Sequence, residues 1–283
     1  MRPRVPRKER VFAVVPTLLT LGNAVCGFGS ITFATKVGPG VAEGNHLLVA
    51  ALLLLAAMVF DMLDGHAARW AKMTSHFGAQ LDSLCDAISF GVAPAFLMLK
   101  FPQVHSLYHP RLLWVVALLY VLCAVMRLAR LNVETGEEDS HQTFSGLPSP
   151  AAAGTIASLV IAVPGLEQLA DVSASPASQT IGGWLMGAIA LGMPLVTLGL
   201  ACLMVSRIRY PHVFNQLFRG RRNFRHLLQL VFAAAAILLV HELAVPLIFL
   251  YFVLGSPLRA LWTEFVSRRL PRADRQPSGE SRT

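Results

Sequence analysis

The chain has 283 residues, of which 54% are hydrophobic and only 14% are charged, and its formal net charge is +8. Soluble domains carry about a quarter of their residues as charged side chains, so this composition excludes an ordinary soluble protein. The basic residues flank apolar runs, where anionic lipid attracts them, and no nucleic-acid-binding motif accompanies them. We therefore expect an all-α integral membrane protein without a nucleic-acid partner.

Apolar runs of about 20 residues, the length that crosses a bilayer as a helix, predict a bundle of about eight transmembrane helices. The runs cover residues 12–34, 46–64, 79–99, 112–131, 150–166, 182–204, 226–241 and 243–263. Only His241 and Glu242 separate the last two runs, which form either a tight hairpin or a broken re-entrant element. We expect one membrane domain over 11–266, between a basic arm at 1–10 and a basic tail of disordered composition at 267–283.

The placement of positive charge predicts the orientation of this bundle. Of the 24 Lys and Arg residues, only Lys36, Lys100 and Arg111 fall on one side of the eight-helix arrangement. Cytoplasmic loops of membrane proteins carry the excess of Lys and Arg. Both termini are therefore expected in the cytoplasm.

Two polar residues of the first apolar run, Thr20 and Asn23, share one helix face because they are three positions apart. An amide within an apolar span needs a partner. That partner is either a neighbouring helix or a polar ligand, and the residues alone leave both open.

A pattern of acidic and small residues joins the second run to the third. It reads Asp61-x2-Asp64-Gly65-x2-Ala68-Arg69-x8-Gly78-x3-Asp82-x3-Asp86. The spacing puts the first two aspartates on one helix face and the last two on a face of the next helix. Carboxylates at the edge of a hydrocarbon core are costly without a partner. Two such faces turned toward each other form a cage of oxygen ligands that suits Mg²⁺ or Mn²⁺.

This pattern resembles the motif of the CDP-alcohol phosphatidyltransferases, membrane enzymes of phospholipid synthesis, at every fixed position. The resemblance implies a six-helix core and one or two divalent cations that hold the diphosphate of a CDP-linked lipid. It assigns the cations to Asp61, Asp64, Asp82 and Asp86, and it makes Asp86 the general base, with metal ligation as the competing role. It also implies a homodimer. The placement of positive charge predicts that the site faces the cytoplasm, and we expect the inner membrane of a bacterium.

The resemblance further implies a set of contacts to the CDP-lipid, namely Thr20, Asn23, Gly65, Ala68, Arg69 and Gly78. Each position has a plainer explanation from the residues alone. The small residues allow close helix packing, Asn23 can bind another helix, and Arg69 can anchor the cytoplasmic side. Gly78 can make a simple turn.

Two features follow in the fourth and fifth runs. Arg127 and Arg130 share a helix face, and Ser149 and Pro150 read as the N-cap and first position of the next helix. Together with residues 82–95, they are similar to the branch of the family that uses serine as acceptor. This implies transfer of the phosphatidyl group from CDP-diacylglycerol to L-serine, giving phosphatidylserine and CMP. It also implies a serine pocket made by Arg127, Arg130 and Ser149, since arginines hold carboxylates well.

Other activities compete with this interpretation. A sister enzyme would use choline, glycerol 3-phosphate or inositol phosphate. Choline requires an aromatic cage rather than arginines, whereas phosphorylated acceptors also use arginines. An ion-coupled transporter is the alternative from another class, but transporters place charges near the midplane, often in repeated halves. Here the acids lie near one interface, and the sequence shows no repeat.

Overall fold

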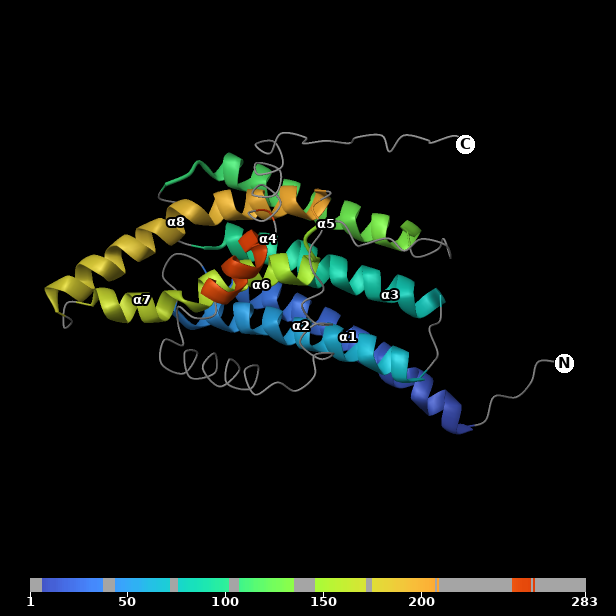
Figure 1. Ribbon diagram of the computed structural model, residues 1–283. Coiled ribbons are helices and arrows are strands. Elements are labelled where there is room, and N and C mark those ends of the chain that lie inside the picture. Colours follow the sequence, from blue (N-terminus) through green and yellow to red (C-terminus); the bar gives the residue numbers. More distant parts are fainter. Residues whose placement is uncertain are drawn as a thin grey trace, which may run out of the picture.

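A computed structural model of the chain describes residues 7–37, 44–71, 76–101, 107–134, 146–171, 175–206, 208, 246–255 and 257. Every regular element within these residues is a helix (Figure 1). In chain order they are α1 (Arg7–Thr35), α2 (Gly44–Ala71), α3 (His76–Asp86), η1 (Ala87–Val92), α4 (Ala93–Leu99), α5 (Pro110–Glu134), α6 (Ser149–Ile161), α7 (Val163–Ala170) and α8 (Pro176–Val205). A short apolar helix over Pro246–Gly255 follows. The expected all-α architecture is confirmed.

Within the described residues, six segments are long and apolar enough to cross a membrane. They are Val15–Thr35, His46–Ala67, Phe77–Leu99, Pro110–Val133, Ser149–Ala170 and Pro176–Val205. These segments match the first six expected runs, so the protein is a multi-pass membrane protein. The expected run at 226–241 lies outside the described residues, as does much of the run at 243–263. The arm at 1–10 is described only from Arg7, where α1 begins, and the tail at 267–283 is not described.

The third span is not the continuous α-helix that the run at 79–99 predicted. It consists of α3, a π-helical turn (η1) and α4. Pro94 explains the change, because proline has no N–H to donate and its ring clashes with the carbonyl four residues earlier in an α-helix. A π-helical turn inserts an extra residue and relieves such a conflict.

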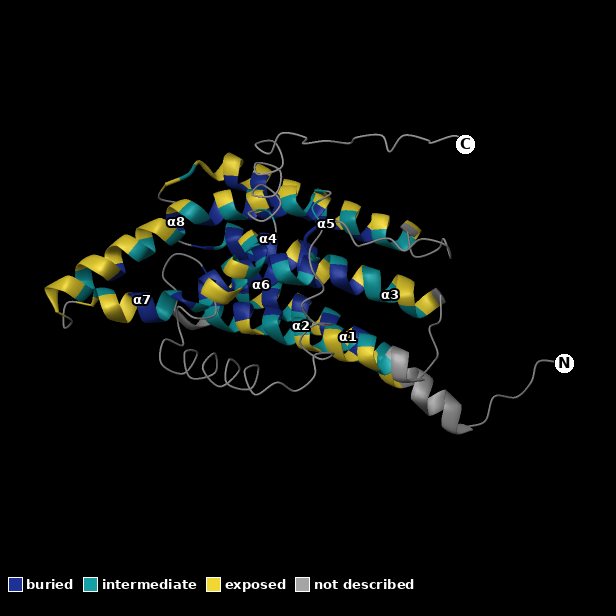
Figure 2. Ribbon diagram, in the orientation of Figure 1, coloured by how far each residue is buried: buried dark blue, intermediate teal, exposed yellow. Residues whose placement is uncertain are grey.

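The fifth span lies in the middle of the bundle, and its small side chains explain why. Small residues allow helices to approach closely within a membrane. Figure 2 shows α6 largely dark blue, whereas α8 carries broad exposed stretches. The buried positions of α6 are Ser149, Ala152, Ala153, Gly154, Thr155, Ile156, Ala157, Ser158, Leu159 and Val160. The span divides at Ala162 into α6 and α7.

The two ends of the bundle carry different elements. The C-terminal ends of α2 and α5 and the start of α3 lie at the right of Figure 1, and the connection from α7 to α8 lies at the left. The acidic pattern ends α2 and runs through α3. Its carboxylates therefore gather at one end of the bundle, which we call the acidic end.

Candidate active site

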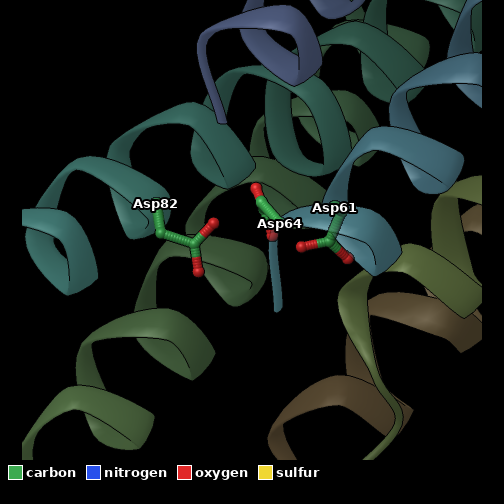
Figure 3. Close-up of side chains that lie close together, drawn as sticks. All are labelled: Asp61, Asp64 and Asp82. Atoms are coloured by element: carbon green, nitrogen blue, oxygen red, sulfur yellow. The ribbon is translucent and has the colours of Figure 1, made fainter. Parts of the chain in front are cut away.

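Three of the four predicted aspartates meet at the acidic end. Asp61 and Asp64 come from α2 and Asp82 from α3, and one carboxylate oxygen of each lies within 4.8 Å of the others. Figure 3 shows the carboxylates of Asp61 and Asp82 pointing toward Asp64 from opposite sides. The i,i+3 spacing on α2 and the facing turn of α3 produce this arrangement, as the pattern predicted.

The three carboxylates fit a divalent cation. Mg²⁺ holds its oxygen ligands at about 2.1 Å, so two ligands of one ion lie at most about 4.2 Å apart. A spread of up to 4.8 Å therefore needs only a small side-chain adjustment. One oxygen of Asp64 (Oδ2) and one of Asp82 (Oδ1) are buried without a hydrogen-bond partner. Buried charged oxygens of this kind are costly unless a cation or donor reaches them.

Unpaired polar atoms are concentrated in this region of the protein. Among the described residues, the buried side-chain atoms without a hydrogen-bond partner are Asn23 Oδ1, Ser30 Oγ, Asp64 Oδ2, Asp82 Oδ1 and Arg127 Nε. All of these except the serine atom belong to residues that the sequence predicted for the site. Several hydroxyls elsewhere in the spans are satisfied within their own helix, as when Thr197 donates to the Met193 carbonyl at 2.8 Å.

Asp86 has a different environment from the other three aspartates. It ends α3, one turn beyond Asp82, and its carboxylate accepts a hydrogen bond from the Asn23 amide at 2.9 Å. Its charge still interacts with those of Asp61 and Asp82. The fourth carboxylate is thus tied to α1 and sits beside the three-aspartate group. The Asn23 side-chain amide donates this hydrogen bond through Nδ2, whereas its Oδ1 has no hydrogen-bond partner.

The predicted CDP-lipid contacts have varied surroundings. Thr20 is buried, donates to the Pro16 carbonyl at 3.0 Å and interacts with the Asp64 carboxylate. Gly65 faces open space, since a side-chain carbon added there would have no atom within 4 Å. Gly78 lies two residues after α3 begins. The backbones of Ala68 and Arg69 belong to α2, but their side chains lie outside the described part of the structure.

The structure brings together two of the three residues of the predicted serine pocket, Arg127 and Ser149, but not Arg130. Arg127 is half-buried, and its Nη1 donates to the Ser149 hydroxyl at 2.9 Å. Arg130 is exposed on α5. Residues three apart on a helix are rotated by about 60°, so one can face the bundle while the other reaches its edge. The guanidinium of Arg127 also interacts with the charges of Asp61 and Asp86.

The prediction that Ser149 caps α6 was wrong. Pro148 is the N-cap, α6 begins at Ser149, and no side chain caps this end. The Ser149 hydroxyl instead accepts the hydrogen bond from Arg127. An arginine from α5 therefore uses the oxygen that the sequence alone suggested for the backbone of α6.

Sequence reasoning missed three hydrogen bonds around the site. Ser83 donates to the Asn132 side chain at 3.0 Å, and Ser89 donates to the Asn23 carbonyl at 3.0 Å. Tyr120, fully buried on α5, donates to the Phe90 carbonyl at 3.2 Å. A signal for the last bond was present, because a tyrosine within an apolar span needs a partner for its hydroxyl.

The sequence is similar to those of several known proteins. Residues 13–196 match the model of a family described as CDP-alcohol phosphatidyltransferase. The chain is 34% identical over 213 residues to an archaetidylserine synthase of Methanothermobacter thermautotrophicus, covering 73% of each protein. It is 29% identical over 199 residues to a CDP-diacylglycerol–serine O-phosphatidyltransferase of Bacillus subtilis, covering 70% of this chain and 90% of the relative.

A third relative matches over a shorter region. The CDP-diacylglycerol–serine O-phosphatidyltransferase of Mycobacterium tuberculosis (strain H37Rv) is 36% identical over 151 residues, which is 52% of this chain. The match spans about half the length of that relative (49%). The family match over residues 13–196 includes the acidic pattern from Asp61 to Asp86.

Proposed function

Because the chain belongs to the CDP-alcohol phosphatidyltransferase family, we propose that it is a CDP-diacylglycerol–serine O-phosphatidyltransferase. It would transfer the phosphatidyl group of CDP-diacylglycerol to the hydroxyl of L-serine, giving phosphatidylserine and CMP. The observation that carries the proposal is the three-aspartate group of Asp61, Asp64 and Asp82, with a separately held fourth carboxylate beside it. The names of the relatives, which include serine as acceptor, support the choice of alcohol.

We propose that Asp61, Asp64 and Asp82, with Asp86 as a further ligand, hold Mg²⁺ or Mn²⁺. When bound, the cation supplies positive charge that neutralises the diphosphate and the phosphate of the departing CMP. Without it four carboxylates lie close together, and among the described side chains the Arg127 guanidinium interacts with two of them, Asp61 and Asp86. Gly65 leaves room for the nucleotide, and Thr20, Asn23, Ala68, Arg69 and Gly78 stay proposed contacts of the CDP-lipid.

Asp86 is the proposed general base. It accepts the proton of the serine hydroxyl while that oxygen forms its bond to the phosphatidyl phosphorus, and the bond from phosphorus to the CMP oxygen breaks. The electron pair of the broken bond leaves with CMP. The Asn23 amide fixes the orientation of the Asp86 carboxylate, so the proton acceptor is already placed when serine arrives.

Arg127 is the proposed contact for the serine carboxylate. Its Nη1 is occupied by Ser149, but its Nε is buried and has no hydrogen-bond partner. A carboxylate approaching this edge would satisfy the buried donor with a charge-assisted hydrogen bond. Arg130 lies one turn further along α5 and is the proposed second contact.

Several properties of the whole protein belong to the same proposal. We propose that the acidic end faces the cytoplasm of a bacterium across its inner membrane, because cytoplasmic segments carry the excess of basic residues. The catalytic membrane domain would cover 11–266, flanked by the basic arm at 1–10 and the basic tail at 267–283. We also propose a homodimer formed through the membrane helices.

The test is release of CMP by the purified protein in detergent, with CDP-diacylglycerol and either Mg²⁺ or Mn²⁺. Serine, choline, inositol phosphate and glycerol 3-phosphate are compared as acceptors. We expect release with serine alone, and a loss of about 10²–10⁴-fold in kcat for Asp86→Asn, the usual contribution of a general base. Asp171→Asn is the matched control, because Asp171 is an exposed carboxylate at the end of α7.

Each other outcome has a definite meaning. Release with a different alcohol would keep the site and reject serine as the acceptor. Release with none of the four alcohols would reject the transferase activity and favour transport. Full activity of Asp86→Asn would reject Asp86 as the base.

A further inference from the structure

The π-helical turn begins directly after Asp86. It covers Ala87–Val92, and its residues Ser89, Phe90 and Gly91 are buried. A π-helical turn is rare because its hydrogen bonds are less favourable than those of an α-helix, and such turns occur often at functional sites. Contacts from other helices are therefore needed to hold it in place.

Tyr120 supplies one such contact from α5. In an α-helix the N–H of residue 94 would donate to the carbonyl of Phe90, but Pro94 has no N–H. The Tyr120 hydroxyl donates to this carbonyl at 3.2 Å, and the whole tyrosine side chain is buried. The Tyr120 hydroxyl thus donates to the Phe90 carbonyl in place of the N–H that Pro94 lacks.

Asn23 of α1 makes the second contact, with Ser89 of the turn. The Ser89 hydroxyl donates to the backbone carbonyl of Asn23 at 3.0 Å, and the side chain of the same asparagine donates to Asp86 at 2.9 Å. Gly27 lets α1 approach this closely, because a carbon added there would lie 2.7 Å from the Ser89 Cα. Asp86, the turn and α1 therefore form a closed ring of covalent and hydrogen bonds.

We infer that Tyr120 is a positioning residue for Asp86, acting through the Phe90 carbonyl and the π-helical turn. The ring on α1 holds one side of the turn, and Tyr120 holds the other. Pro94 still prevents α-helical register in this variant, but loss of the hydroxyl leaves the Phe90 carbonyl without this donor. The turn then shifts within its π-helical form, which moves the last residue of α3. The Asp86 carboxylate then moves relative to the three-aspartate group. The inference rests on the proposed function, because it assigns the consequence of this movement to the transfer step.

The test compares Tyr120→Phe with Tyr108→Phe. Tyr108 is the matched control, since its hydroxyl also donates to a backbone carbonyl, that of Leu191 at 2.7 Å, away from the acidic end. For Tyr120→Phe we expect kcat to fall about 10- to 100-fold, because a displacement of about 1 Å can cost that much. The KM values for serine and CDP-diacylglycerol should change less than twofold, on the order of experimental scatter. Tyr108→Phe should match the parent enzyme.

Two readouts do not depend on turnover. Hydrogen–deuterium exchange should quicken in peptides that cover residues 87–95 of Tyr120→Phe, and not in Tyr108→Phe. Binding of Mn²⁺, titrated directly by electron paramagnetic resonance, should weaken less than in Asp82→Asn, since Asp61, Asp64 and Asp82 lie outside the ring and only the further ligand Asp86 moves. Unchanged exchange in residues 87–95 would overturn the inference, even for a protein that releases no CMP and so fails the proposed function.

A second variant separates positioning from plain stability. Pro94→Ala restores the missing N–H, so Tyr120→Phe/Pro94→Ala should regain thermal stability without regaining kcat. Recovery of both would show that Tyr120 only satisfies a carbonyl, and would overturn the inference. If Tyr120→Phe does not fold, Ser89→Ala replaces it, with the same fall in kcat and unchanged KM expected. A Ser89→Ala enzyme of full kcat would then overturn the inference.

Discussion

Two glycines, Gly27 of α1 and Gly183 of α8, show how differently one membrane bundle is packed. Next to Asp86, near the middle of the first and third spans, Gly27 of α1 lies against η1, and an added carbon would be 2.7 Å from the Ser89 Cα. By contrast, Gly183 of α8 lines a shallow apolar groove of about 560 Å³ between α7 and α8. An added carbon there would have no atom of another described helix within 4 Å. Glycine thus allows a tight contact in one place and leaves a surface open in the other.

Hydrogen bonding of polar groups also differs between the acidic end and the region of the groove. At the end with the groove, Thr180 donates to the Pro176 carbonyl at 2.9 Å, so its hydroxyl is satisfied within its own helix. At the acidic end, Asp64, Asp82 and Arg127 keep buried atoms without partners. Unpaired buried groups cost about 1–3 kcal/mol each, so a fold retains them only where another gain offsets the cost. Substrate and cation would supply the missing partners at the acidic end.

The largest expected effect comes from removing a carboxylate of the three-aspartate group. Asp82→Asn should weaken Mn²⁺ binding and lower kcat/KM by about 10²–10³-fold, the size seen when one contact to developing charge is lost. Direct titration of Mn²⁺ and the CMP-release assay measure the two effects. Asp171→Asn should change neither quantity. Parental affinity of Asp82→Asn for Mn²⁺ would remove this carboxylate from the cation site.

The second effect tests the tight contact itself. Gly27→Ala should force α1 away from η1 and lower the free energy of unfolding by about 1–3 kcal/mol, as overpacking does. Because the same contact carries the bond from Ser89 to Asn23, kcat should fall more than either KM rises. Thermal unfolding in detergent and steady-state kinetics measure these changes. A fully stable and active Gly27→Ala enzyme would show that the contact adjusts without cost.

A smaller effect is expected at the proposed serine pocket. Arg127→Lys keeps the charge but loses the fork of donors, so the KM for serine should rise about tenfold, the loss of one charge-assisted hydrogen bond. Arg130→Lys should raise it less, since Arg130 is exposed. The KM for CDP-diacylglycerol should stay constant in both variants. Equal changes in the two KM values would argue that Arg127 holds the nucleotide or the fold rather than serine.

The spans and the three-aspartate group could be predicted from the sequence, for related physical reasons. Charge is so costly in hydrocarbon that the few acidic residues of an apolar chain must share a partner. Helical spacing then decides which of them face each other. Asp61, Asp64 and Asp82 follow from these two rules, and their meeting across α2 and α3 needs no further information.

The contacts that hold Asp86 could not be predicted in this way. Helical spacing places Asp82 and Asp86 on one face. The π-helical turn that follows Asp86, however, is contacted by Tyr120, which lies 34 positions beyond Asp86 in the sequence and on another helix. Pro94 indicates that the α-helix of the third span is interrupted, but it does not predict that the interruption is a π-helical turn. Ser149 likewise had a local explanation as a cap, and only the fold shows that Arg127 reaches it first.

The smallest effect is expected at Gly183 of α8, where the helix surface is open. Gly183→Ala fills no space within the chain and replaces glycine with a better helix former, so stability should rise by about 0.5–1 kcal/mol with kcat/KM unchanged. Thermal unfolding of this variant beside Gly27→Ala measures the contrast between the two glycines. Destabilisation by Gly183→Ala would mean that something outside the chain packs on α8. A second copy is the occupant that the proposed homodimer offers, and a matching loss of dimer in detergent would place its interface along this groove.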